Sequence, residues 1–197
     1  MAKRFFDIVA ATLGLLILLP FLLVVAIIIK LDSQGSILFL QQRIGKGGEP
    51  FFLFKFRTMH VGADKGTAIT VGNRDPRITT IGYYLRKFKM DELPQLINVL
   101  KGEMSFVGPR PEVKKFVDLY TPEQRRVLDV APGMTDYASI LFRNENELLN
   151  GKSDPVAFYV DHIMPQKLQL NLKYIDTNNL WIDIKILFKT LVVLFRK

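Results

Sequence analysis

Two adjacent carboxylates, Asp91 and Glu92, stand in a strongly basic part of the sequence. Three cationic side chains lie just before them: Arg86, Lys87 and Lys89. An acidic pair in such surroundings suits a Mg²⁺ ion that bridges to phosphate, and it suits a carboxylate nucleophile that the cations keep ionised for attack on phosphorus. The simpler interpretation is the acidic first turn of a helix, where the helix dipole favours carboxylates and Pro94 is tolerated.

A second candidate group is Arg110, which has a proline on each side, Pro109 and Pro111. The two prolines restrict the backbone and hold one guanidinium group in a defined direction. Arginine offers a planar, bidentate match to phosphate oxygens. Taken alone, this tripeptide is more often a turn with an exposed arginine.

Composition narrows the chemistry further. The chain has 197 residues, a formal net charge of +8, no cysteine and two histidines. The absence of cysteine excludes thiolate chemistry and disulfides, and two histidines far apart in sequence disfavour a histidine-rich zinc site. The positive charge predicts an anionic partner, such as lipid head groups or phosphorylated small molecules, and no nucleic-acid-binding motif is present.

The N-terminal part of the chain predicts a membrane segment. Residues 8–29 carry no charge, and a straight helix of that length would be roughly 33 Å long, enough to cross a bilayer. Pro20 near its middle and cationic residues at both flanks favour a re-entrant helix that returns to the same side. An ordinary spanning helix remains the alternative. Asp7 needs a partner in this setting, and Lys3 or Arg4 is expected to supply it.

The remaining chain predicts an α+β, mainly helical domain over residues 33–197, after a membrane helix over residues 1–32. Apolar, β-branched and aromatic runs at 37–44 and 51–59 flank a glycine-rich turn and predict a β-hairpin. Residues 61–77 are expected to form a mobile loop. Residues 81–100 favour helix with a break near Asp91, and Gly102 ends it.

Three signals describe the C-terminal half. Thr121 and Asp154, each followed by proline, predict helix starts, and Pro165 is expected to kink or end the second helix. Residues 180–197 predict an amphipathic helix in the membrane interface, with Trp181 at head-group depth. One face holds its apolar side chains: Leu180, Ile184, Leu187, Leu191, Leu194 and Phe195. A helix packed on a protein core is the alternative interpretation.

An ordered set of motifs resembles the bacterial sugar transferases, the monotopic polyprenyl-phosphate phosphoglycosyl transferases. The motifs are Phe54-Lys55-Phe56-Arg57-Thr58-Met59, Asp91-Glu92-Leu93-Pro94-Gln95-Leu96, Asn98-Val99-Leu100-Lys101-Gly102, Met104-Ser105-Phe106-Val107-Gly108-Pro109-Arg110-Pro111 and Pro132-Gly133-Met134-Thr135. Each motif is weak alone, but the order is specific. The likeness covers nearly the whole chain, which is expected to be a small, minimal form.

The resemblance implies a reaction and a place for it. Asp91 would attack the β-phosphate of a UDP-sugar, release UMP and carry the phosphosugar covalently. Polyprenyl (undecaprenyl) phosphate would then accept it, with Glu92 as the partner of Asp91 in a catalytic dyad. The implied cofactor is Mg²⁺, held by Asp91. The N-terminal helix, broken at Pro20, would enter one leaflet of the bacterial inner membrane, with the catalytic domain on the cytoplasmic face.

The resemblance also implies four cations around the phosphates: Lys55, Arg86, Arg110 and Arg143. The sequence departs from the family at three places. Residues 136–139 replace a Gly-Trp-Ala-Gln segment, and Leu19 stands where some relatives have serine before the hairpin proline. Asn171 occupies the position of an expected aspartate; if that acid has a role in relatives, the role here is weakened or supplied by another residue, such as Asp176 or Asp154. The alternative function is a single-span membrane protein with a basic, non-catalytic binding domain, or an inactive scaffold. Sugar identity, glycan pathway and oligomeric state carry no prediction.

Overall fold

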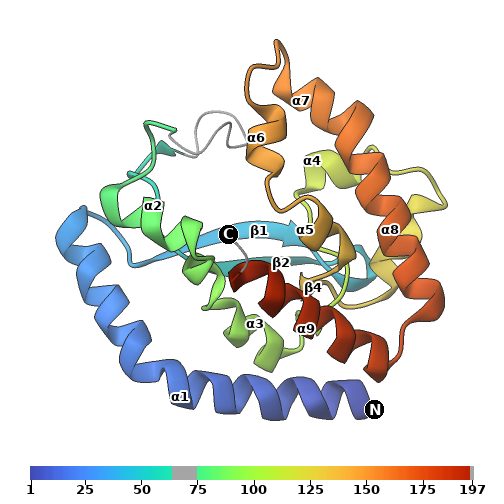
Figure 1. The fold of residues 1–197 in the computed structure, drawn as a ribbon, viewed down its shortest axis with the longest axis horizontal. Helices are drawn as coiled ribbons and strands as arrows, with labels where there is room; N and C mark the ends of the chain where they lie inside the picture. The colour runs from blue at the N-terminus through green and yellow to red at the C-terminus, as the bar shows by residue number, and fades with distance from the viewer. Residues whose placement is uncertain (64–74, 196–197) are drawn as a thin grey trace.

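The computed structural model describes residues 1–63 and 75–195, which form a mainly helical molecule with two small sheets (Figure 1). The predicted mainly helical α+β class is confirmed. The helices are α1 (Ala2–Asp32), α2 (Thr80–Lys87), α3 (Gln95–Lys101), α4 (Lys114–Val117), α5 (Tyr137–Leu141), α6 (Glu145–Leu149), α7 (Pro155–Phe158), α8 (Met164–Thr177) and α9 (Leu180–Phe195). The strands are β1 (Leu38–Ile44), β2 (Pro50–Phe56), β3 (Ser105–Val107) and β4 (Gly133–Thr135). Most of the loop expected at residues 61–77 lies outside the described residues.

The predicted hairpin is confirmed as an antiparallel pair in which Leu38 of β1 lies opposite Phe56 of β2. Helix α3 is joined to it by the buried amide of Asn98. This side chain accepts a hydrogen bond from the backbone N–H of Phe54 (3.0 Å) and donates one to the carbonyl oxygen of Phe52 (2.8 Å). The Asn98 amide thus hydrogen-bonds two backbone groups at the free edge of β2, and these bonds fix the position of α3 along the hairpin.

The second sheet pairs β3 with β4 in parallel, with Ser105 opposite Gly133. The sequence indicates only a turn at Pro132-Gly133, so this pairing was missed. The two chains approach closely because a Cβ atom on Gly133 would lie 2.1 Å from the backbone nitrogen of Gly108. The pair positions the Pro109-Arg110-Pro111 segment that follows β3.

Helix α1 is 31 residues long, contains Pro20 and bends partway along its length (Figure 1). It packs against α2, α3 and β3, but most of its apolar side chains face away from the protein; Ile17, for example, is 75% exposed. Within residues 1–63 and 75–195 it is the one helix long and apolar enough to cross a membrane. An exposed apolar surface of this extent is typical of contact with lipid.

The polar contacts at the start of α1 differ from the prediction. Asp7 pairs with neither Lys3 nor Arg4. Its Oδ1 accepts hydrogen bonds from Ser105 Oγ (3.1 Å) and from the backbone N–H of Phe106 (3.2 Å). Lys3 instead pairs with Asp183 of α9 (2.5 Å), and Arg4 donates to carbonyl oxygens at the C-terminal end of α3. The side chains of Lys3, Arg4 and Asp7 point from the start of α1 toward three different elements. Each therefore pairs with a residue distant in sequence and not with its neighbour in the helix.

A break between two helices holds the acid pair, as predicted. Lys89 adopts a left-handed conformation (φ 56°) after α2, and a 3₁₀ turn, η3 (Met90–Glu92), contains Asp91 and Glu92. The expected first turn of a helix is therefore wrong in detail: α3 begins only after Pro94, which lacks an N–H. Gly102 ends α3 with φ 84°, as predicted.

The predicted helix signals after residue 120 are real, although the helices differ. Thr121 and Gln124 exchange the expected capping hydrogen bonds, but they begin a short 3₁₀ helix, η4 (Gln124–Asp129). Asp154 caps α7 as predicted. Pro165 does not end the helix: a π-helical turn, η5 (Tyr159–Ile163), lies between α7 and α8, and its wider winding accommodates the proline in the first turn of α8.

Helix α9 has an outer and an inner face. Its inner face, with Ile186 fully buried and Asp183 2% exposed, packs on the protein. The outer face is apolar and exposed: Trp181, Ile184, Phe188, Leu191 and Val192. The inner face agrees with the alternative of a helix packed on the protein, and the predicted apolar face is divided, because Leu187 packs on the core while Ile184 and Leu191 are exposed. Arg196 and Lys197 lie outside the described residues.

Candidate active site

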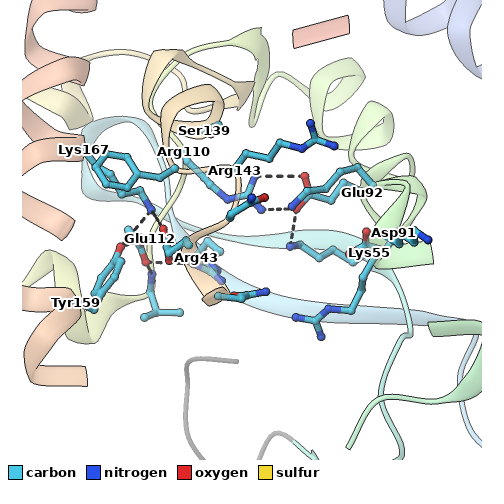
Figure 2. Close-up of a pocket in the computed structure, with 18 of the residues that line it drawn as sticks. Arg43, Lys55, Asp91, Glu92, Arg110, Glu112, Ser139, Arg143, Tyr159 and Lys167 are labelled. Carbon is cyan, nitrogen blue, oxygen red and sulfur yellow. Dashed lines mark hydrogen bonds and ion pairs between the residues drawn. The ribbon is translucent and has the colours of Figure 1, made fainter. Parts of the chain in front are cut away.

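A pocket of about 470 Å³ opens between the hairpin, α2, η3 and the helices of the C-terminal half (Figure 2). All six side chains predicted for catalysis and phosphate binding line it: Lys55, Arg86, Asp91, Glu92, Arg110 and Arg143. They come from separate segments, namely β2, α2, η3, the residues after β3 and the residues after α5. The fold therefore gathers residues that span 88 positions of sequence into one cavity, from Lys55 to Arg143.

Glu92 is the centre of an ion-pair network. Lys55 Nζ lies 3.1 Å from its Oε1, and the Arg110 guanidinium donates to both carboxylate oxygens, one of them at 3.3 Å. Burial alone would raise the pKa of Glu92, but Arg110 and Lys55 outweigh it and hold that pKa well below its ordinary value. Glu92 is therefore an anion whose oxygens are already engaged, and it fixes the position of two cations.

Besides the two flanking prolines, a further residue holds the backbone of Arg110. The Arg110 N–H donates to the carboxylate of Asp136 (3.1 Å), which is fully buried. Asp136 also caps α5 through the N–H of Ser139. The pKa of Arg110 is raised, chiefly by Glu92, so this guanidinium is a permanent cation in the pocket. The departure from the family at residues 136–139 thus lies against the site.

Asp91 differs from Glu92 in its hydrogen bonding and in the direction of its pKa shift. It is 8% exposed, and its buried Oδ1 has no hydrogen-bond partner among the described residues. Burial raises the pKa of Asp91 above its ordinary value, and the negative charge of Glu92 raises it further. An unpaired buried carboxylate is costly unless a cation or a substrate completes it. Two adjacent acids with opposite pKa shifts are typical of groups with different roles in catalysis.

The donor set around Asp91 bears on magnesium. Within residues 1–63 and 75–195, no three histidine or acidic side chains converge to form a closed metal site. Mg²⁺ is commonly held by only one or two carboxylates, with substrate phosphates and water completing its octahedron. The unpartnered oxygen of Asp91 in a pocket lined by several cations fits that open kind of site.

Sequence reasoning missed the other end of the pocket. Arg43 pairs with Glu112 (3.3 Å), and the Tyr159 hydroxyl donates to Glu112 (2.6 Å). Lys167 pairs with Glu145 (2.9 Å). Glu112 directly follows the Pro-Arg-Pro segment, which was a usable signal. Tyr159 and Lys167 lie on helical segments far along the chain, and nothing in their local sequence marks them.

The departures elsewhere from the family pattern fall away from this pocket. Asn171 is buried in α8 and does not line it. The proposed substitutes are occupied: Asp176 pairs with Arg126 at the surface, and Asp154 caps α7. Neither acid lines the pocket.

Comparison with known proteins places the chain in a family. Residues 1–197 match the bacterial sugar transferases. The chain is 36% identical over 194 residues to the UDP-N-acetylgalactosamine-undecaprenyl-phosphate N-acetylgalactosaminephosphotransferase of Aeromonas hydrophila, covering 96% of this chain and 42% of that protein. It is 40% identical over 191 residues to the UDP-glucose:undecaprenyl-phosphate glucose-1-phosphate transferase of Caulobacter vibrioides, covering 95% and 67%.

A third relative matches over most of both lengths. The exopolysaccharide production protein ExoY of Rhizobium meliloti is 34% identical over 206 residues, covering 97% of this chain and 84% of that protein. The coverage of the relatives thus ranges from less than half to most of their length. On the full-length family match and these identities, the chain belongs to the bacterial sugar transferase family.

Proposed function

We propose that the chain is a phosphoglycosyl transferase that moves a phosphosugar from a UDP-sugar to undecaprenyl phosphate and releases UMP. The observation that carries the proposal is the unpartnered carboxylate oxygen of Asp91, in a pocket where Glu92 holds Lys55 and Arg110. The alternative, a basic membrane protein that binds without chemistry, gives no role to that oxygen. The names of the Aeromonas and Caulobacter relatives support the same substrates.

In the first step, a carboxylate oxygen of Asp91 attacks the β-phosphorus of the donor. A bond forms between that oxygen and phosphorus, the bond from phosphorus to the bridging oxygen breaks, and the electron pair leaves with UMP. Lys55 and Arg110, held by Glu92, offset the negative charge that otherwise repels a carboxylate from a diphosphate. The product is a phosphosugar bound covalently to Asp91 as an acyl phosphate.

In the second step, an oxygen of the acceptor phosphate attacks the same phosphorus. The bond between phosphorus and Asp91 breaks, the carboxylate is restored, and the sugar leaves as an undecaprenyl diphosphate derivative. The exposed apolar surfaces of α1 and of the outer face of α9 suit an enzyme that meets this lipid in the membrane. Trp181, 82% exposed, fits the interfacial depth proposed for it.

Both ends of α1 are tied to the catalytic domain, which supports the proposal of a re-entrant helix broken at Pro20. At one end Lys3 pairs with Asp183, and at the other Arg57, directly after β2, donates to the carbonyl oxygen of Ser33 (2.6 Å). A straight span would place these ends on opposite sides of the bilayer. We place both ends, and the domain, on the cytoplasmic face of the bacterial inner membrane.

Accessibility labelling in spheroplasts tests this topology. Single cysteines at Ala2 and at Gln34, introduced into a chain that has none, should both react only when the cytoplasmic side is made accessible. A cysteine at the exposed Lys114 marks the domain side in the same experiment. Labelling of the two α1 flanks from opposite sides would refute the re-entrant helix.

Asp91 would hold Mg²⁺, and the ion would supply positive charge that neutralises the donor diphosphate. UMP release from a UDP-sugar should therefore fall to background in EDTA and return when excess Mg²⁺ is added. The assay measures UMP with purified chain, UDP-sugar and undecaprenyl phosphate, over a panel of donors to find the preferred sugar. Undiminished UMP release in the chelator would remove the metal from the proposal.

A further inference from the structure

The pocket extends well beyond the reacting carboxylates. Figure 2 shows Asp91, Glu92 and Lys55 at one end and a second group of polar side chains at the opposite end, with Arg110, Arg143 and Ser139 between them. This second group, termed the distal end, consists of Arg43, Glu112, Glu145, Tyr159 and Lys167. The reaction proposed above assigns no role to the distal end.

The distal end is a built, hydrogen-bonded arrangement. Glu112 pairs with Arg43 (3.3 Å) and accepts a hydrogen bond from the Tyr159 hydroxyl (2.6 Å). Lys167 pairs with Glu145 (2.9 Å), and its Nζ lies 3.5 Å from the Tyr159 hydroxyl oxygen. Tyr159 is 3% exposed and Lys167 9%. Their positions are therefore fixed by the fold before any ligand arrives.

The charges of the distal end distinguish it from the phosphate end. Its two cations, Arg43 and Lys167, each have a carboxylate partner, so the group is neutral as a whole. A neutral group of donors and acceptors suits an uncharged ligand with several hydroxyl or amide groups, and a further phosphate would find no net attraction there. Phe142, which is partly exposed, also lines the pocket and offers apolar surface to a flat ring.

Reaction geometry decides which part of the donor points that way. In phosphoryl transfer the attacking oxygen, the phosphorus and the leaving oxygen lie roughly in line. Attack by Asp91 at one end of the pocket therefore sends the leaving UMP away from Asp91, toward the opposite end. The sugar is attached through an oxygen that is not in line, so it lies to the side of this axis.

We infer that the distal end binds the nucleoside of the donor, with Glu112, Tyr159 and Lys167 positioned for the ribose hydroxyls and the polar edge of the base. This inference rests on the proposed function, since it uses the attack by Asp91. Ser139 adds an independent observation: its Oγ is buried between the two ends and has no hydrogen-bond partner among the described residues. A nucleotide that spans the pocket would supply that partner.

Binding of UMP to the full chain in detergent tests the inference without turnover. Tyr159→Phe removes the hydroxyl that contacts Glu112 and keeps the ring that packs on Phe116, with centroids 5.0 Å apart. Lys167→Met removes the cation of the second pair. By calorimetry, each variant should bind UMP about tenfold more weakly than the wild type, the usual loss for one hydrogen bond to a charged group.

The donor assay gives the discriminating comparison. The KM for the UDP-sugar should rise by the same factor as the Kd for UMP, because donor and product share the nucleoside. Lys114→Met, which removes an exposed ion pair with Asp118 and does not change a pocket-lining side chain, is the matched control and should change neither. Unfolding temperatures of all three variants confirm that the proteins compared are folded.

Two outcomes would overturn the inference. A raised KM with unchanged UMP binding would place the sugar at the distal end, and unchanged values of both would leave it without ligand contact. The proposed function is judged separately, by whether a phosphosugar adduct forms on Asp91 of the wild type. UMP binding that weakens in the variants of a chain that forms no adduct would support the nucleoside site and refute the mechanism.

Discussion

Asp91→Asn is expected to abolish turnover, lowering kcat by at least about 10⁴-fold, as losses of a covalent nucleophile do. The amide has nearly the shape of the carboxylate but is not a nucleophile toward phosphorus and is a poor magnesium ligand. The variant should nevertheless fold. Burial and Glu92 raise the pKa of Asp91, so the ionised side chain destabilises the folded state at neutral pH and a neutral one relieves that cost.

The sign of this stability effect is itself a test. A pKa raised on folding means that a proton binds the folded state more tightly, so stability falls as pH rises through the unfolded and then the folded pKa. At neutral pH the unfolding temperature of the Asn variant should equal or exceed that of the wild type. Mass spectrometry should find a phosphosugar on residue 91 of the wild type incubated with donor alone, and none on the variant.

Full activity of Asp91→Asn would remove the nucleophile assignment. Turnover through a single ternary complex, with no adduct on the wild type at any time, would remove the two-step mechanism even if the variant is inactive.

Glu92→Asp distinguishes the role of Glu92 from that of Asp91. The substitution keeps the negative charge but shortens the reach of the carboxylate to Arg110 and Lys55, so it should slow the reaction without preventing adduct formation.

Arg110→Lys is expected to lower kcat/KM by about 10²- to 10³-fold, although it conserves charge. The guanidinium reaches both oxygens of Glu92 at once, and a lysine ammonium offers a single point of charge without that planar fork. The change therefore disturbs the position of the cation at the site of charge development as well as one contact.

Steady-state kinetics on donor and acceptor separately will measure this effect. Arg126→Lys is the matched control, because Arg126 forms an exposed ion pair with Asp176 outside the pocket, and it should behave as the wild type. Exposed pairs of this kind contribute roughly 0–1 kcal/mol to stability. Activity of Arg110→Lys within about threefold of the wild type would show that only the charge of residue 110 matters, contrary to the bidentate role.

Local signals account for what could be predicted from the residues alone. The hairpin, the helix end at Gly102 and the cap at Asp154 each depend on a few neighbouring residues whose backbone preferences are strong. The ordered motifs identified the family, and four charged residues they contain, Lys55, Asp91, Glu92 and Arg110, line one pocket. The roles assigned to Asp91, Glu92 and the four cations remain predictions for the experiments above.

Contacts between distant residues account for what the residues alone did not reveal. Lys3 and Asp183, separated by 180 positions, form an ion pair, and Tyr159 reaches Glu112 across 47. The β3–β4 pairing depends on two glycines that let separate segments approach. Local sequence could establish which side chains were suited to phosphate chemistry. Only the tertiary structure determined which of these side chains lie together. Buried polar groups form hydrogen bonds and ion pairs with the partners that the packing of helices and strands brings close to them.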